Sequence, residues 1–340
     1  MKIREIVITG KDTAILRDGE FDETELAPDE LLVETECSFI STGTELSIFT
    51  GRDPQTRQTG GWCEWPWKAG YANVGRVKAA GSATRRAKVG QRVFSFGKHV
   101  SAHRYPESRM ILTVPDGIEP GLAAASRMAG VAMTALILVE IKGNPWVAVY
   151  GLGMVGNLAA QTFVARGCRV IGVDPVQHRR DLAKTCGVQH VVGGTAEEAR
   201  KAIRDLTGGA LCAITIDAVG HSAVVADAIK STATFGQHVI LGTPRVPVET
   251  NVTEMLRDIH SRFIVMRCAL EWCLPEYPQT GSTWSLLSKQ ETIFDWMSRG
   301  ELKIEPLISH RLPPTRIQEA YEGLERTPET FTGVVLDWGR

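Results

Sequence analysis

The chain has 340 residues, of which 43% are hydrophobic and 23% are charged, and its formal net charge is −1. This composition is typical of globular proteins, and the length is enough for about two domains, each with its own core. Lys and Arg are scattered along the chain, so the sequence predicts neither a nucleic-acid partner nor a membrane-surface partner.

The N-terminus begins with an alternating, strand-like run and lacks the apolar core and cleavage site of a signal peptide. No uninterrupted apolar stretch approaches the ~20 residues of a membrane span, so we expect a cytoplasmic location. The seven cysteines are widely spaced and form no CxxC pair. That spacing argues against a disulfide framework and against a thiolate zinc site.

Short alternating segments separated by glycine-containing turns dominate the first 105 residues, which predicts a small, mostly β domain. The alternating segments are Glu30–Ile40, Asn73–Val77, Gln91–Phe96 and Arg109–Val114. A loop at Gly60–Trp67 holds three tryptophans. It is either an aromatic wall over a ligand or the packed anchor of a loop.

From Pro120 an Ala-rich helical run at Leu122–Ile141 leads into strict alternation of strand and helix patterns. Such alternation predicts an α/β fold with a doubly wound, six-stranded parallel sheet. The predicted strands are Trp146–Tyr150, Arg169–Val173, Gln189–Val192, Cys212–Ile216, Gln237–Leu241 and Phe263–Cys268.

The tail has a helical pattern near Lys289–Arg299, another near Thr315–Glu325, and a last strand at Gly333–Trp338. A tail of this size is able to fold back onto the first domain. We therefore predict one domain from residues 1–124 and 270–340, and a Rossmann-type nucleotide-binding domain from residues 125–269.

A GxGxxG motif lies between the first strand and the first helix of the predicted parallel sheet. Its residues are Gly151, Leu152, Gly153, Met154, Val155 and Gly156. In this context the first glycine permits a tight turn, the second allows a pyrophosphate to approach the helix N-terminus, and the third allows close helix packing. The alternative is a glycine-rich turn that binds nothing.

Asp174 ends the second strand of this unit, 18 residues after Gly156. An acidic residue there accepts hydrogen bonds from the adenosine ribose and repels a 2′-phosphate, so NAD(H) is favoured over NADP(H). Arg179 and Arg180 weaken this preference, since either is able to meet a phosphate.

Two later turns are expected at the same crevice, because the carboxyl ends of parallel strands meet at one edge of the sheet. Val219 lies in the turn after the fourth strand, and Gly242 and Thr243 follow the fifth. We expect them near the nicotinamide half of the cofactor, although ordinary loop roles remain an alternative for each.

Together these features resemble the medium-chain dehydrogenase/reductase superfamily over nearly the whole chain. The resemblance implies a GroES-like β-rich catalytic domain beside the Rossmann domain. It also implies a homodimer or higher homo-oligomer, formed in many members through the last Rossmann strand, here near Phe263–Cys268. The expected partner is a small-molecule substrate.

The sequence departs from the zinc alcohol dehydrogenases of that family at each metal position. Thr42 stands where the first cysteine would fall, Tyr71 where the histidine of the GHE pair would fall, and Met128 near the later cysteine. The cysteine-rich lobe for structural zinc is missing. Threonine, tyrosine and methionine do not supply a zinc ligand set, so no metal is expected. An atypical zinc site using Glu45 and His99 is the alternative.

The string Ile40–Glu45, together with Gly70–Ala72 and His99, resembles a zinc-free branch of the family that includes enzymes similar to bacteriochlorophyllide a dehydrogenase. The substrate does not follow from this resemblance, because these motifs belong to a wide group.

Without zinc, a side chain must take up the proton of the alcohol. His99 is the first candidate, because an imidazole titrates near neutrality, and a purely structural hydrogen bond is its alternative. Glu45 is the second, as base, as substrate anchor or as a cap of the short helix at Glu45–Phe49. Tyr71 and Thr42 are candidates for hydrogen bonds to substrate.

The sequence thus predicts an NAD(H)-dependent oxidoreductase that interconverts a secondary alcohol and a ketone without catalytic zinc. The expected substrate is a polyol, a sugar-like molecule or a bulky hydroxyalkyl compound. One alternative is a zinc-free reductase of activated C=C bonds, such as a quinone or enoyl reductase. A second alternative is a non-enzymatic NAD(H)-binding protein.

Overall fold

A computed structural model describes residues 1–23 and 26–339, and the chain divides into two compact units. Unit 1 contains Met1–Arg127, Leu274–Arg299 and Leu307–Arg340, and unit 2 contains Met128–Cys273 and Gly300–Pro306. The predicted boundaries after residues 124 and 269 lie close to the observed ones after residues 127 and 273. The return of residues 300–306 to unit 2 was not predicted.

Unit 1 is rich in β-structure, as the alternating segments predicted. Its strands are β1 (Lys2–Gly10), β2 (Thr13–Glu20), β3 (Glu30–Phe39), β4 (Trp67–Lys68), β5 (Asn73–Ala80), β6 (Arg92–Ser95), β7 (Ala102–Pro106), β8 (Ile111–Thr113), β15 (His310–Leu312) and β16 (Val334–Asp337). Its helices are α1 (Thr44–Phe49), α8 (Leu286–Ser298) and α9 (Ile317–Arg326), with short 3₁₀ turns at Pro54–Arg57 and Pro314–Arg316.

These strands form two sheets. One has the order β2-β1-β4, and the other has the order β15-β16-β3-β5-β6-β8, with β7 pairing to β3. The C-terminal strand β16 pairs antiparallel with β3, with Leu336 opposite Ser38. The tail therefore completes the sheet that contains β3, which is the physical reason that the two ends of the chain form one unit.

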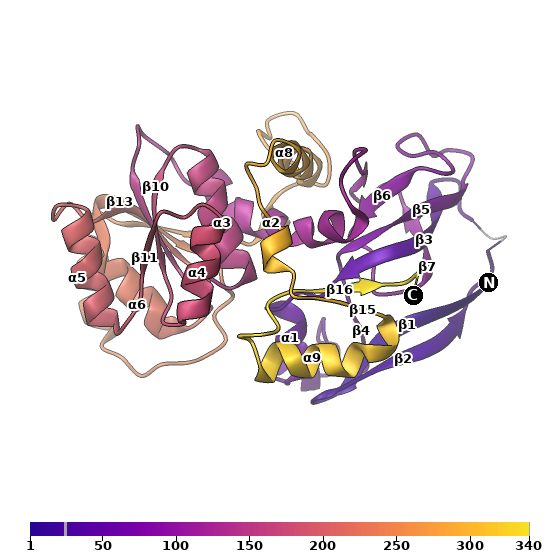
Figure 1. Cartoon of the computed structure of the whole chain (residues 1–340), viewed down its shortest axis with the longest axis horizontal. Coiled ribbons are helices and arrows are strands. Elements are labelled where there is room, and N and C mark those ends of the chain that lie inside the picture. Colours follow the sequence, from indigo (N-terminus) through magenta and orange to yellow (C-terminus); the bar gives the residue numbers. More distant parts are fainter. Residues whose placement is uncertain (24–25, 340) are drawn as a thin grey trace. The chain divides into compact units, whose positions relative to one another are not determined.

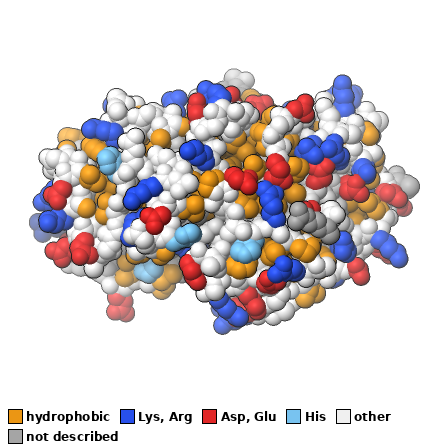
Figure 2. Space-filling view, viewed as in Figure 1, with side chains coloured by type: hydrophobic (Ala, Val, Ile, Leu, Met, Phe, Trp, Pro, Cys, Tyr) orange, Lys and Arg blue, Asp and Glu red, His pale blue; other side chains and the backbone are white. Residues whose placement is uncertain are grey.

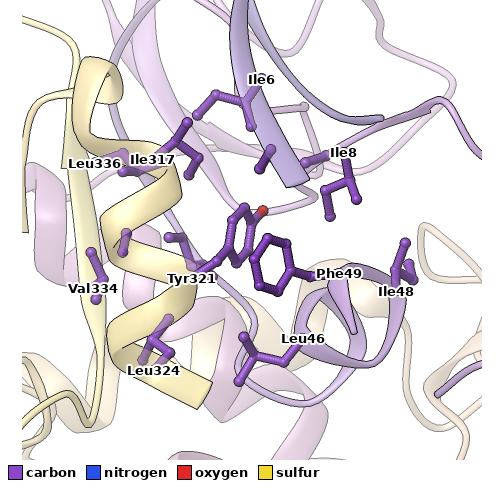
Figure 3. Close-up of a cluster of buried hydrophobic side chains, with 14 of the residues drawn as sticks. Ile6, Ile8, Leu46, Ile48, Phe49, Ile317, Tyr321, Leu324, Val334 and Leu336 are labelled. Atoms are coloured by element: carbon purple, nitrogen blue, oxygen red, sulfur yellow. The ribbon is translucent and has the colours of Figure 1, made fainter. Parts of the chain in front are cut away.

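One core of unit 1 collects apolar side chains from β1, α1, α9 and β16 (Figure 3). At its centre the rings of Phe49 and Tyr321 stack, with centroids 5.1 Å apart and planes 19° from parallel. Both rings are almost fully buried. Stacked rings in a dry core stabilise the packing by about 0.5–1.5 kcal/mol beyond their burial.

Unit 2 is a doubly wound α/β domain, as predicted. Its parallel strands are β9 (Trp146–Tyr150), β10 (Arg169–Val173), β11 (His190–Val192), β12 (Cys212–Asp217), β13 (Thr232–Ile240) and β14 (Val265–Cys268). Its helices are α3 (Met154–Ala165), α4 (Gln177–Thr185), α5 (Ala196–Leu206), α6 (Ser222–Lys230) and α7 (Val252–Ser261), with 3₁₀ turns at Glu271–Cys273 and Glu305–Leu307.

The six strands have the order β11-β10-β9-β12-β13-β14, and every pairing is parallel. In Figure 1, α3 and α4 lie on one side of this sheet, and α5 and α6 lie on the other. The order reverses direction beside β9, which places a topological switch point at its carboxyl end. The predicted six-stranded sheet is confirmed.

Several elements differ from the sequence-based expectation, among them β7 and β15, which were not expected, and α2 (Pro120–Ile137), which ends at Ile137 instead of Ile141. The strand expected at Gln237–Leu241 begins five residues earlier, at Thr232, where β13 pairs with Cys212 of β12. Strand β2 was not predicted because its outer face is largely exposed, so its apolar pattern is weak.

Helix α2 (Pro120–Ile137) begins in unit 1 and ends in unit 2. It is long and apolar enough to cross a membrane by length and composition, but 78% of it is buried inside the protein, as in the core helix of a globular fold. All seven cysteines are free, and only Cys268 and Cys273 are exposed. On the face shown in Figure 2, acidic and basic side chains are interspersed.

Candidate cofactor and active sites

The glycine-rich turn joins β9 to α3. Gly151 has a φ of +87°, which ordinary L-residues rarely adopt. A Cβ atom on Gly156 would lie only 1.8 Å from the carbonyl oxygen of Gly151, so no side chain fits there. These two glycines therefore bend the chain sharply and bring the first turn of α3 against it.

Gly153 has a different role, because a Cβ atom there would meet nothing within 4 Å. It is the N-cap of α3 and makes no side-chain cap hydrogen bond to the first turn of the helix. The backbone N–H groups of that turn, near Met154 and Val155, have no partner within the helix and carry the positive end of the helix dipole. This geometry fits the pyrophosphate of a dinucleotide.

The carboxylate of Asp174 is buried at the end of β10 and anchored to this turn. One oxygen accepts the Leu152 N–H at 2.8 Å, and the other accepts the Val176 N–H at 2.8 Å. Arg179 lies 3.6 Å away and forms an ion pair with the same carboxylate. Asp174 thus links β10 to the glycine-rich turn, and its remaining lone pairs are the ones available to a ribose.

Arg180 is engaged by the protein itself. Its guanidinium donates to the carbonyl oxygens of Asp174 and Pro175, and to the side chain of Gln177. These bonds do not favour the alternative that Arg180 meets a cofactor phosphate. Arg179, whose side chain is 32% exposed, is the better placed of the two arginines.

The turns after β12 and β13 meet beside the glycine-rich turn. The N–H groups of Leu241 and Gly242 both donate to the carbonyl oxygen of Asp217, and Arg245 donates to that of Gly220. Val219 is half exposed and packs so closely on the turn that a Cβ atom at Gly151 would lie 2.6 Å from it.

The structure therefore brings Gly151, Val219, Gly242 and the adjoining Thr243 together at the carboxyl ends of three neighbouring strands. This is the edge of a doubly wound sheet where ligands bind. The expectation that these residues share one site agrees with this placement, and their contacts with a nicotinamide stay a prediction.

In unit 1, a buried network is built around the carboxylate of Glu45, the second residue of α1. One of its oxygens accepts the N–H of Ser41 at 2.8 Å. The other lies 3.0 Å from Nε2 of His99 and accepts the hydroxyl of Tyr321 at 2.6 Å. The side chains of Glu45 and His99 have no exposed surface.

The second ring nitrogen of His99 is also engaged. Nδ1 lies 2.8 Å from the hydroxyl oxygen of Ser38, which in turn accepts the indole N–H of Trp338. The expectation that His99 takes the substrate proton does not match this geometry, because its ring is buried and protein groups occupy both nitrogens. The structural alternative for His99, a fixed hydrogen bond, describes what the structure contains. Glu45 does not cap α1, whose N-cap Gly43 has no side-chain cap hydrogen bond, but accepts the N–H of Ser41 just before the helix.

Tyr71 and Thr42, the other two candidates, both keep exposed surface. The hydroxyl of Tyr71 donates to Ser41 Oγ at 2.5 Å. The guanidinium carbon of Arg127 lies 4.8 Å from the centroid of the Tyr71 ring and 4.3 Å from that of Phe96. The phenol of Tyr71 thus has the hydroxyl group of Ser41 and the cation of Arg127 beside it.

Sequence reasoning missed Ser41 and Arg127 as site residues. Ser41 lies in the motif Ile40–Glu45, but only its neighbour Thr42 stands at a metal-ligand position of the family. Arg127 carried a usable signal, since it is the one cation within the apolar run Leu122–Leu138. Burying a charged side chain on such a helix costs free energy unless the charge is paired. Its presence there therefore indicates a role.

A catalytic zinc ion does not fit the donors present. Within residues 1–23 and 26–339, no group of three or more His, Cys, Asp or Glu side chains is arranged to hold a metal ion. Glu45 and His99, the donors considered for an atypical site, bond each other and further protein groups. Zinc requires several such ligands converging in tetrahedral geometry.

The structure agrees with a packed anchor for two of the three tryptophans in the loop Gly60–Trp67. Trp67 is buried in the core of unit 1, and the indole N–H of Trp65 donates to the carbonyl oxygen of Ile48. Both therefore anchor the loop. Trp62 is 53% exposed and meets Trp67 edge to face, with centroids 6.2 Å apart.

Removing the imidazole in His99→Ala should lower the free energy of unfolding by about 3 kcal/mol, because the buried Glu45 and Ser38 each lose a partner. Urea unfolding followed by tryptophan fluorescence measures this loss. His178→Ala, at an exposed position of α4, is the control and should change stability by less than about 0.5 kcal/mol. A His99→Ala protein as stable as its parent would contradict the structural role.

Comparisons with known proteins agree with this architecture. The family model described as "Zinc-binding dehydrogenase" matches residues 154–272. An alcohol dehydrogenase from Geobacillus stearothermophilus is 34% identical over 135 residues, which are 39% of this chain and 39% of that enzyme. A D-guloside 3-dehydrogenase from Shigella flexneri is 24% identical over 267 residues, covering 77% of this chain and 75% of that one.

Among solved structures, a protein described as a zinc-binding dehydrogenase from Sinorhizobium meliloti 1021, bound to NADP, superimposes with a TM-score of 0.80. The alignment covers 99% of each chain at 19% sequence identity, so it shows a shared fold. The glycine-rich turn, the six-stranded sheet and the β-rich unit agree with these matches. The chain shares the fold of zinc-type alcohol dehydrogenase-like proteins and is similar in sequence to the "Zinc-binding dehydrogenase" family model over residues 154–272.

Proposed function

We propose that this protein is an NAD(H)-dependent oxidoreductase that interconverts a secondary alcohol and a ketone without catalytic zinc. The observation that carries the proposal is the open N-terminus of α3 at Gly153, at the switch point of the parallel sheet. A bound nicotinamide dinucleotide supplies the hydride acceptor or donor of such a reaction. The chain's own residues must then orient the substrate and move its hydroxyl proton.

The preference for NAD(H) over NADP(H) rests on Asp174. A buried carboxylate beside the ribose position disfavours a second negative group there. Its ion pair with Arg179 offsets part of that charge. NAD(H) is still favoured, because a 2′-phosphate would have to compete with Asp174 for the same arginine.

Two features support chemistry without zinc. Thr42, Tyr71 and Met128 stand at or near the positions of the family's metal ligands. The side chains of Glu45 and His99 form a hydrogen bond with each other. Zinc acidifies an alcohol by binding its oxygen. Here a protein hydroxyl or another titratable group has to accept that proton instead.

For the substrate we propose a polyol, a sugar-like molecule or a bulky hydroxyalkyl compound. The similarity to a D-guloside 3-dehydrogenase supports a sugar-like molecule. The hydroxyl groups of Tyr71, Ser41 and Thr42 lie on neighbouring segments of unit 1 and suit a substrate that carries several hydroxyl groups. We place the reaction in the cytoplasm, with this small molecule as the principal partner.

Reduction of an activated C=C bond is the alternative reaction. It also needs a dinucleotide, but no group that accepts the proton of an alcohol. It is distinguished by activity on quinones or enones rather than on alcohols. A non-enzymatic NAD(H)-binding protein is the second alternative, and it would bind the cofactor without turning over any substrate.

We also propose that two copies pair through β14, the edge strand of the parallel sheet. All four of its residues are exposed. The rings of Phe235 and Phe263 stack beside it, with centroids 4.9 Å apart, and are 75% and 62% exposed. An apolar, unprotected strand edge is prone to pair with another strand.

The proposed reaction is tested by an NAD⁺ reduction screen over polyols, sugars and bulky secondary alcohols, with quinones and enones assayed with NADH and NADPH. We expect NADH formation with at least one alcohol. Metal analysis accompanies the screen, and protein stripped with a chelator should keep its rate. Stoichiometric zinc, with activity lost on its removal, would overturn the zinc-free proposal, and activity on C=C substrates alone would favour the alternative.

Cofactor preference is tested with Asp174→Ser, which removes the charge while keeping a small polar side chain. The ratio of kcat/KM for NAD⁺ to that for NADP⁺ should fall about tenfold or more, because one charge repulsion and the ribose hydrogen bonds are lost. Arg179→Ala is the matched variant and should move the ratio the opposite way. An unchanged ratio in both variants would argue against this site for the ribose.

The oligomeric state is tested by light scattering coupled to size exclusion. The unmodified protein should elute as a dimer or larger assembly, and Phe263→Asp should shift it to the monomer, because the charge would be desolvated at the interface. Val89→Asp, at an equally exposed position of unit 1, should leave the mass unchanged. A monomeric parent protein at micromolar concentration would refute the pairing.

A further inference from the structure

Tyr71 is the candidate whose surroundings suit proton transfer. Its phenol donates to Ser41 Oγ at 2.5 Å, and the residue keeps part of its surface exposed. Ser41 is itself held in place, because its backbone N–H donates to the carboxylate of Glu45. The buried network of Glu45 and His99 therefore holds the hydroxyl groups of Ser41 and Tyr71 in place. Tyr71 keeps exposed surface, whereas the side chains of Glu45 and His99 have none.

Arg127 supplies a fixed positive charge to the same phenol. It is 1% exposed, and its guanidinium lies against the rings of Tyr71 and Phe96. A cation 4.8 Å from a phenol ring stabilises the phenolate that remains when the proton leaves. Low local exposure to water strengthens this interaction.

We propose that Tyr71 is the proton donor and acceptor of the reaction, with Ser41 and Arg127 as positioning residues. This inference rests on the proposed function. In ketone reduction, the carbonyl carbon gains a hydride from the cofactor, and the two π electrons move to the oxygen. That oxygen takes the proton from the Tyr71 hydroxyl and leaves a phenolate.

The phenolate of Tyr71, a residue that keeps part of its surface exposed, then regains a proton from water. Alcohol oxidation is the exact reverse: the phenolate takes the hydroxyl proton as the carbon loses a hydride to the cofactor. Atoms and charge balance in both directions, and no metal is needed.

The ionisation of Tyr71 is consistent with this role. Burial raises the pKa of Tyr71, while Arg127 and the hydrogen bonds of Ser41 and Thr44 lower it, and Glu45 raises it. The net pKa lies above the ordinary value of 10.0, so the phenol carries its proton at neutral pH. It is ready to donate in the reductive direction.

The first test is Tyr71→Phe, which removes the hydroxyl and keeps the ring against Arg127. The kcat for the substrate found in the screen should fall about 100-fold or more, while cofactor affinity and the unfolding midpoint stay near those of the parent. Tyr105→Phe is the control. It removes a buried hydroxyl that accepts the backbone N–H of Phe96 and donates to the backbone carbonyl of Met110, and kcat should stay unchanged.

The positioning residues are tested by Ser41→Ala and Arg127→Met. Each should lower kcat by about tenfold with a smaller change in KM, and Arg127→Lys should recover most of the loss, because it restores the charge. A loss that Arg127→Lys does not relieve would show that Arg127 acts by packing.

A second measurement distinguishes chemistry from structure. A fluorinated tyrosine at position 71 keeps the hydroxyl but ionises at lower pH, so the pH profile of alcohol oxidation should move to lower pH. Fluorinated tyrosine at position 105 should leave that profile unchanged. The charged groups that set the profile are Arg127 and Glu45, which influence the phenol, and both are retained.

The outcomes separate the two proposals. Full turnover by folded Tyr71→Phe, or an unmoved pH profile, would overturn the role of Tyr71 and leave the proposed function standing. No turnover of any alcohol or ketone by the unmodified protein would overturn the proposed function, and this inference with it.

Discussion

The organisation of unit 1 depends on one buried carboxylate. Glu45 has no exposed surface, and it is satisfied by Ser41, His99 and Tyr321, which come from three separate parts of the chain. An ionisable group without access to water is tolerated only when such partners are complete. The network therefore requires that α1, the loop after β6 and helix α9 come together, and it holds Ser41 where Tyr71 reaches it.

In the proposed reaction, a protein side chain and not a metal ion exchanges the proton of the substrate. Glu45 and His99, both good metal donors, are turned toward each other and toward structural hydroxyl groups. Tyr71, which keeps part of its surface exposed, lies beside the guanidinium of Arg127. A metal ion polarises the substrate oxygen directly, whereas a phenol must exchange a proton with it.

Unit 2 is governed by backbone geometry. Gly156 permits no side chain, Gly153 leaves the start of α3 open, and Asp174 ties the turn to the next strand. The same aspartate serves both the fold and the cofactor preference. Its partner Arg179 offsets part of the carboxylate's charge, so the proposed preference for NAD(H) depends on an ion pair as well as on the motif.

The sequence by itself determined the parallel sheet, the position of the glycine-rich turn and the existence of a β-rich unit closed by the tail. These depend on local periodicity and on residues such as Gly151 and Gly156, whose backbone roles are visible in a motif. Only the tertiary structure decided which polar residues remain candidates for the active site. His99 and Glu45 satisfy each other, and Tyr71, Ser41 and Arg127 converge from segments 30 and 56 residues away from Tyr71. Sequence patterns report which face of an element is buried, but the partner of a buried polar group comes from distant segments, and its identity emerges only when the chain is folded.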